Sequence, residues 1–226
     1  MGSYPLNARA AGPGQHLWGA AQWIGIVATG ALITGLLAAP TFTLAALWNV
    51  AIPLLPASFL INPGIWRNVC PLATLGTLPN GLAARRALGA HLLPAAGVIG
   101  MVLLVVLVPA RRGVFNTDGT ALAVAILAVA LTAASLGAFF DLKAGFCNAI
   151  CPVLPVERLY GQHPLLAVDN PRCTPCTMCT PRACIDLAAT KSVAQVLGRS
   201  RRSRAWLKTA YGIFAAAFPG FVIGYY

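Results

Sequence analysis

Charged residues are scarce in this chain: they make up 9% of the 226 residues, and only five residues are acidic. Soluble domains carry about a quarter charged residues, so this composition excludes an ordinary soluble domain. Hydrophobic residues account for 58% of the chain, the mean hydropathy is +0.74, and apolar runs of bilayer-spanning length recur. We therefore expect an all-α membrane protein whose main partner is the lipid bilayer.

Histidine is also rare, and the three histidines, His16, His91 and His163, lie outside the interiors of the apolar runs. A haem held inside a bundle needs paired histidines on facing helices, so no haem is expected. The interiors of the apolar runs carry no acidic or basic residue, which argues against an ion transporter built from this chain alone. No phosphate-binding loop, nucleotide-binding fingerprint or serine nucleophile elbow stands out, so no catalytic residues are assigned.

Apolar stretches predict about five transmembrane helices, arranged as two hairpins and one further helix. They cover residues 17–39, 42–61, 91–110, 121–140 and 206–226. The second stretch contains Pro53 and Pro56, so a kinked span and a re-entrant segment are both open; five spans are the preferred interpretation.

This layout divides the chain into four parts. We expect an N-terminal tail, a four-helix membrane region with a cysteine-bearing loop at 62–90, a polar cysteine-rich segment and a C-terminal transmembrane helix. The tail has no clear features of a cleavable signal peptide. The boundaries of the four parts are 1–16, 17–141, 142–205 and 206–226.

Basic residues predict the orientation. If all five stretches span, the N-terminus, the 62–90 loop and the 142–205 segment share one side of the membrane. Of the 16 Lys and Arg residues, all except Arg111 and Arg112 lie on that side or at its membrane edge. The positive-inside rule then places this side in the cytoplasm. The net charge of +11 is attributed to basic flanks of membrane helices, so no nucleic-acid partner is expected.

The most specific motif is a cysteine run at Cys173, Cys176, Cys179 and Cys184. Its C-x2-C-x2-C spacing lets thiolates of one loop turn toward one point, and bacterial ferredoxins use such a run to hold a [4Fe-4S] cluster. The usual run ends in x3-C-P, whereas Cys184 comes one residue later and is followed by Ile185. Zinc, a disulfide pair and unbound thiols are the alternatives, although zinc sites usually use two separated pairs.

A short repeat precedes the run. Residues 64–71 (GIWRNVCP) and 145–152 (GFCNAICP) align on their Cys-Pro pairs, and each follows two apolar stretches. Proline after cysteine suits the first turn of a helix, where a thiolate would lie at the positive end of the dipole. The spacing of Cys147 and Cys151 favours metal ligation, whereas Cys70 has the alternative of a buried apolar cysteine.

Seven cysteines cannot supply the eight ligands of two complete clusters, so two ligand sets stay open. In the first, the four cysteines of the run hold one cluster, and Cys70, Cys147 and Cys151 form an incomplete second site. In the second, which is slightly preferred, Cys151 or Cys70 completes a cluster on the first three cysteines of the run, and Cys184 joins Cys147 elsewhere. We expect at least one [4Fe-4S] cluster and leave a second open.

Three arginines lie near these cysteines in the sequence: Arg158, Arg172 and Arg182. Positive charge beside an anionic cluster favours the reduced form and raises its potential. Arginines that stay solvated or hold lipid headgroups are the alternative.

Membrane hairpins that end in Cys-Pro loops, followed by a ferredoxin-like run, resemble the membrane-bound polyferredoxin-type proteins. That group includes the quinol-oxidising membrane subunit of periplasmic nitrate reductase systems and the membrane electron donor of nitrous oxide reductase. The resemblance covers roughly residues 17–190 in layout, although such proteins commonly carry two full ferredoxin runs and this chain has one. It implies [4Fe-4S] clusters at the cytoplasmic face of a bacterial inner membrane, contact with quinone, and partner subunits of a redox complex.

These observations predict an electron-transfer subunit between the quinone pool and a partner redox protein, in preference to a stand-alone enzyme. The second hypothesis is a structural or assembly subunit in which a cluster or zinc staples the fold. The third is a metal-handling chaperone with transient thiols at Cys147 and Cys151, which predicts that both are alkylatable in the folded protein.

Overall fold

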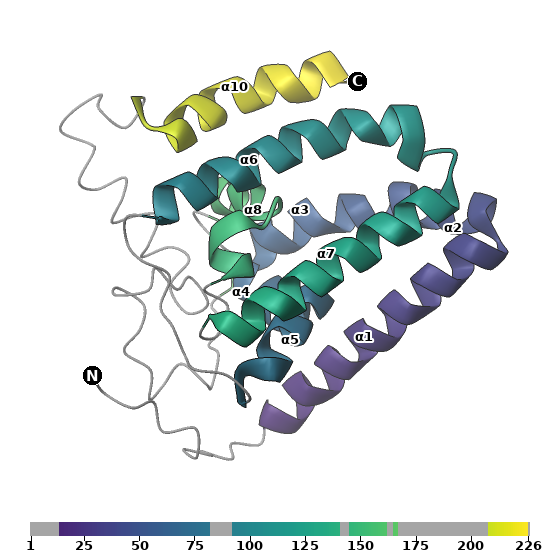
Figure 1. Cartoon of the computed structure of the whole chain (residues 1–226). Helices are drawn as coiled ribbons and strands as arrows, with labels where there is room; N and C mark the ends of the chain where they lie inside the picture. Colours follow the sequence, from purple (N-terminus) through teal and green to yellow (C-terminus); the bar gives the residue numbers. More distant parts are fainter. Residues whose placement is uncertain (1–13, 82–91, 141–144, 162–164, 167–207, 226) are drawn as a thin grey trace.

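The computed structural model describes residues 14–81, 92–140, 145–161, 165–166 and 208–225. Within these ranges nearly every residue is helical and no strand occurs, which confirms the predicted all-α class. Long helices run side by side, and several short helices gather among them toward one end (Figure 1).

The first hairpin consists of α1 (Gly14–Ala38) and a helical run through α2 (Pro40–Ala46), η1 (Leu47–Ala51) and α3 (Ile52–Ile61). The π-helix η1 ends two residues before Pro53. This proline lacks the N–H that a regular α-helical turn would need. The run Pro40–Ile61 has 22 residues, about 33 Å of helix, so it is long enough to cross the bilayer. The prolines therefore widen a turn without breaking the helix, which favours a span over a re-entrant segment.

The second hairpin consists of α6 (Leu93–Ala110) and α7 (Gly119–Phe139), which are connected through the π-helix η3 (Arg111–Phe115). Asp118 caps α7, because its Oδ1 accepts a hydrogen bond from the backbone N–H of Ala121 at 2.9 Å.

Four helical runs in the described part of the chain are long and apolar enough to cross a membrane: Leu17–Ala38, Pro40–Ile61, Ala95–Phe115 and Gly119–Phe139. They correspond to the first four predicted stretches, and they define a multi-pass membrane protein. The fifth stretch is represented by α10 (Ala210–Tyr225), which has 16 residues and a length of about 24 Å. It lies beside α6 (Figure 1), and its crossing of the bilayer stays a prediction.

The segment after the first hairpin is more ordered than the predicted turn. It contains α4 (Pro63–Val69), α5 (Pro71–Thr77) and the 3-10 helix η2 (Leu78–Gly81). Asn62 caps α4 by accepting a hydrogen bond from the N–H of Gly64 at 2.6 Å, and a proline opens each of the two α-helices. The expected loop therefore begins with two short helices, because its Asn and Pro residues act as helix starts.

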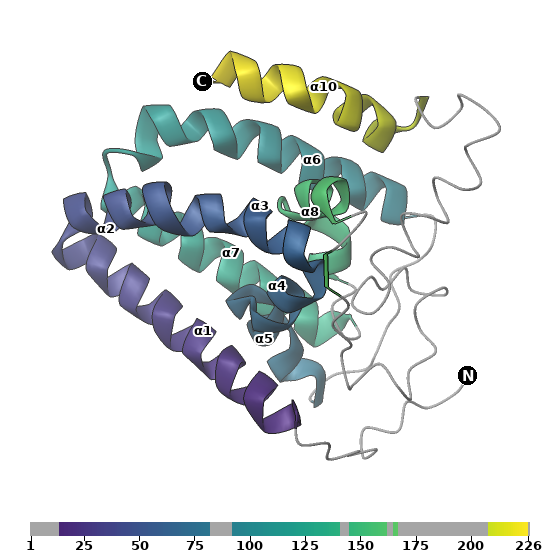
Figure 2. The ribbon, with the colours of Figure 1, turned by 180° about the vertical axis from the view of Figure 1, so that it is seen from behind.

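The corresponding segment after the second hairpin contains the π-helix η4 (Phe146–Ile150) and α8 (Leu154–Tyr160). Each segment packs against the first helix of its own hairpin, α4 on α1 and η4 on α6. The helix that follows each Cys-Pro pair then crosses over: α5 packs on α7, and α8 packs on α3 (Figure 2). The sequence repeat is thus also a structural repeat, in which the helix after each Cys-Pro pair packs against a helix of the other hairpin.

Glycines make these close contacts possible. A Cβ on Gly25 would lie 2.7 Å from the carbonyl oxygen of Val69, and one on Gly100 would lie 3.0 Å from that of Cys151. A Cβ on Gly137 would overlap the carbonyl oxygen of Gly76. Gly25 and Gly100 both lie inside spans, so the Cys-Pro segments are tucked between the helices, where irregular backbone is buried against protein.

Aromatic and basic side chains meet at the opposite end of the helices. The indole N–H of Trp48 donates to the carbonyl oxygen of Phe115 at 3.2 Å. The guanidinium of Arg111 lies 4.4 Å from the Trp48 ring centre, and that of Arg112 lies 4.8 Å from the Tyr225 ring centre. Such pairs are typical of a membrane interface. Both arginines therefore lie at the end of the helices opposite the Cys-Pro segments.

Candidate metal centre

Cys70 and Cys151 have almost the same backbone conformation. Cys70 has φ −54° and ψ 122°, and Cys151 has φ −59° and ψ 123°. The following proline disfavours the α region for the residue before it, so both cysteines leave the preceding helix in an extended conformation. For Cys70 the proline opens a helix as predicted, whereas Cys151 is followed by a turn, and α8 begins at Leu154.

The two cysteines also interact. Burial raises the pKa of the Cys151 thiol to about 12, and the nearby Cys70 thiol adds to the rise. Glu157 contributes in the same direction, whereas the backbone N–H groups of Val153 and Leu154 oppose it. By exposure, Cys70 is buried and Cys151 is half-buried, and neither cysteine forms a disulfide. Two neighbouring thiolates repel each other, which raises the pKa of both thiols. A cation bound by both would lower these pKa values, so that the thiols would release their protons on binding it.

Cys147 lies in η4, four residues before Cys151, and is half-buried. The predicted helical turn is present, but it is a π turn: the N–H of Cys151 donates to the carbonyl oxygen of Phe146 at 3.0 Å. Within the described ranges, no three His, Cys, Asp or Glu side chains form a group that could hold a metal ion. The three cysteines of the repeat therefore do not make a site by themselves.

The run of Cys173, Cys176, Cys179 and Cys184 lies outside the described residues, as do Arg172 and Arg182. A centre with four thiolates that includes Cys70 or Cys151 has to draw its other ligands from that run. The second ligand set, in which a Cys-Pro cysteine completes a cluster on the run, is of this kind and stays a prediction.

A buried polar network joins the two halves beside these cysteines, and it was not predicted. Nε of Arg67 donates to Oε1 of Glu157 at 2.5 Å, and Nη1 of Arg67 donates to Oδ1 of Asn148 at 2.8 Å. The relative exposure of Arg67 is 3%, and that of Glu157 and Asn148 is 5% each. Arg67 and Asn148 occupy the same position in the two copies of the repeat, which is the signal that could have indicated their pairing.

Three hydrogen bonds connect the chain after α8 to the end of α3. The backbone N–H groups of Leu165 and Leu166 donate to the carbonyl oxygens of Leu60 and Ile61, each at 3.0 Å. The amide nitrogen of Asn62 donates to the carbonyl oxygen of Leu166 at 2.5 Å. These bonds hold the chain against the first hairpin just before it enters the cysteine-rich segment.

The fold and these loops define a class: a multi-pass α-helical membrane protein with paired Cys-Pro segments at one end of its spans. Comparisons of the chain with protein-family models, with curated proteins and with solved structures gave no match. The resemblance to polyferredoxin-type proteins therefore rests on the cysteine motifs and the layout of the chain.

Proposed function

We propose that this protein is a membrane-anchored iron–sulfur subunit that passes electrons between the quinone pool and a partner redox protein. The observation that carries the proposal is the juxtaposition of Cys70 and Cys151. Two residues 81 positions apart in the numbering take the same conformation, and the thiol of one raises the pKa of the other. The ferredoxin-like run then supplies further thiolates in the same chain.

The chemistry of the donor set fits an iron–sulfur cluster. Thiolates are the ligands that such clusters use, and Cys70, Cys147 and Cys151 are not joined in disulfides. A bound [4Fe-4S] cluster would supply one-electron transfer. In the proposed arrangement, Cys151 or Cys70 serves as the fourth ligand to Cys173, Cys176 and Cys179, and Cys147 and Cys184 are candidate ligands of a second centre.

Localisation follows from the proposal and the charge pattern. The Cys-Pro segments lie at the end of the spans opposite Arg111 and Arg112. The positive-inside rule assigns the cysteine end to the cytoplasmic side, and the resemblance implies a bacterial inner membrane. Quinone as the electron carrier, and other subunits as partners, come from the resemblance.

The test is a redox titration of the anaerobically purified protein, followed by electron paramagnetic resonance, in parallel with reduction by quinol in membrane vesicles. We expect a reversible cluster signal that is lost in Cys176→Ser and kept in the matched control Thr177→Ser. A Cys176→Ser variant with the spectrum of the wild type would refute the assignment.

A structural subunit is the second candidate, and the burial of Cys70 between packed helices favours it. A metal at this place would link the two hairpins and add its binding free energy to folding. The same titration separates the two functions, because a structural staple would not cycle reversibly near the potential of the quinone couple.

A further inference from the structure

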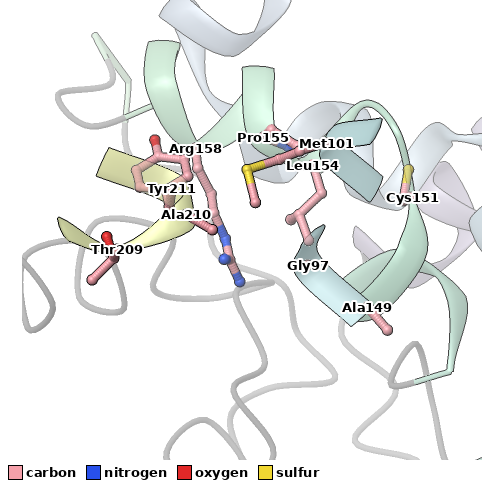
Figure 3. A pocket seen from close by; sticks show the side chains of 10 residues that line it. All are labelled: Gly97, Met101, Ala149, Cys151, Leu154, Pro155, Arg158, Thr209, Ala210 and Tyr211. Atoms are coloured by element: carbon pink, nitrogen blue, oxygen red, sulfur yellow. The ribbon is translucent and has the colours of Figure 1, made fainter. Parts of the chain in front are cut away.

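A cavity of about 180 Å³ lies between α6, α8 and the first turn of α10 (Figure 3). Its apolar side includes Met101, Leu154 and Pro155, and its polar side includes Arg158, Thr209 and Tyr211. Among the described residues that line it, none is acidic. Because Gly97, which also lines the cavity, is two residues inside the span that starts at Ala95, the cavity lies at the cysteine end of the membrane region.

Arg158 brings a positive charge and an unpaired donor to this cavity. Its Nε is buried and has no hydrogen-bond partner among the described residues. The adjacent Glu157 is hydrogen-bonded to Arg67, so the carboxylate closest in sequence is already engaged. Burial, and then the positive charge of Arg67, lower the pKa of Arg158, whereas Tyr211 and Glu157 act in the opposite direction and offset part of the shift. Arg158 as a whole is half-buried, and a cation with a buried, unpaired donor is stabilised by an anion that accepts its hydrogen bond.

The start of α10 adds to the positive potential at the same place. Thr209 is the N-cap, since its Oγ1 accepts a hydrogen bond from the N–H of Gly212 at 3.1 Å. The positive end of the α10 dipole therefore faces the cavity that Thr209 and Ala210 line. In Figure 3 the Arg158 guanidinium extends into the space between Thr209 and Gly97, and the Cys151 sulfur lies beyond Leu154 on the other side.

The surface beyond the cavity is apolar. Val98 and Val102 on α6 are 40% and 54% exposed, and Ile213 on α10 is 60% exposed. Both helices continue from the cavity toward the opposite end of the bundle (Figure 1). A ligand with an anionic group in the cavity and hydrocarbon chains along these helices would match both parts of this surface.

We propose that the cavity binds the phosphate group of an acidic phospholipid, with Arg158 as its charged donor and the first turn of α10 as its second contact. The acyl chains then lie along α6 and α10. An acidic lipid matches the site better than a zwitterionic one, because it leaves a net negative charge beside Arg158. Cys151 also lines the cavity, so the test is made on the metal-free protein and varies Arg158 alone.

The experiment compares the full-length protein in phosphatidylcholine nanodiscs with and without phosphatidylglycerol. Bound phosphatidylglycerol is measured by native mass spectrometry, and thermal stability by fluorescence. We expect Arg158→Gln to bind phosphatidylglycerol about tenfold more weakly or worse, the scale of a lost charge-assisted hydrogen bond. Arg112→Gln, an exposed arginine at the other end, should bind like the wild type.

Two further measurements keep the result interpretable. In phosphatidylcholine alone, Arg158→Gln should be at least as stable as the wild type, because it removes a charged donor that is buried without a partner; a folding defect there would overturn the proposal. Inorganic phosphate is the second probe. If it stabilised the wild type as strongly as phosphatidylglycerol does, the ligand would be a soluble phosphate and the lipid assignment would be overturned. Undiminished phosphatidylglycerol binding by Arg158→Gln would overturn the site itself.

Discussion

Removing one side of the buried Arg67–Glu157 pair should destabilise the protein strongly. The two side chains are 3% and 5% exposed, so the charge that remains would be left in a place that water hardly reaches. Breaking a buried ion pair in this way costs about 3–5 kcal/mol. We therefore expect Glu157→Leu to lower the free energy of unfolding by about that amount, which is a large share of the stability of an ordinary domain.

Removing both charges together should cost much less. In the double variant Arg67→Met, Glu157→Leu neither partner of the pair is left behind as a charge, and the hydrogen bond to Asn148 is lost. An unsatisfied buried amide costs about 1–3 kcal/mol. The double-mutant cycle should thus show a coupling of several kcal/mol, with the double variant more stable than Glu157→Leu.

The measurement is unfolding of the metal-free protein by sodium dodecyl sulfate in detergent micelles, followed by far-ultraviolet circular dichroism. Lys208→Gln serves as the control, because Lys208 is exposed and should change stability by less than about 0.5 kcal/mol. If Glu157→Leu cost no more than this control, the pair would not be the buried link between the two halves that the geometry describes.

The remaining predictions concern packing and thiol chemistry. Gly137→Ala should cost about 1–3 kcal/mol by overpacking against Gly76, whereas Gly30→Ala, whose Cβ meets nothing within 4 Å, should be neutral or slightly stabilising; equal thermal midpoints for the two would contradict the packing. The rise of the Cys151 pKa from 9.0 to about 12 corresponds to about a thousandfold less thiolate near pH 8, so iodoacetamide should label Cys151 that much more slowly in the folded metal-free protein than after unfolding. The same shift means that the unfolded state loses this proton first, so the stability of the metal-free protein should be maintained below pH 9 and fall as the pH rises toward 12; a flat profile would argue against the burial of this thiol. If iodoacetamide labelled Cys151 as fast in the folded protein as after unfolding, that result would favour the chaperone hypothesis.

Much of the membrane architecture could be predicted from the sequence, because hydrocarbon selects long apolar helices with few exceptions. The first four stretches became helices of spanning length, and the alignment on the Cys-Pro pairs became a repeat of backbone conformation. Both signals are local: apolar length fixes a span, and the proline fixes the residue before it.

What could not be predicted depends on contacts between distant residues. Arg67 and Glu157 are 90 positions apart, and no local pattern indicates that they meet. The residues 62–77 contain turn formers that also start helices, and the choice between these roles depends on packing against α1 and α7. The glycines of those contacts, such as Gly25 and Gly137, look like ordinary small residues of a membrane helix in the sequence.

The central claim is that thiolates of this chain hold iron and sulfide, and elemental analysis tests it most directly. Iron, acid-labile sulfide and zinc would be measured in the anaerobically purified protein and in Cys176→Ser. The proposal predicts about four iron and four sulfide per chain for one cluster, or about twice that for two, with a clear loss in the variant. Iron and sulfide near zero in the wild type, with zinc at about one per chain, would contradict it.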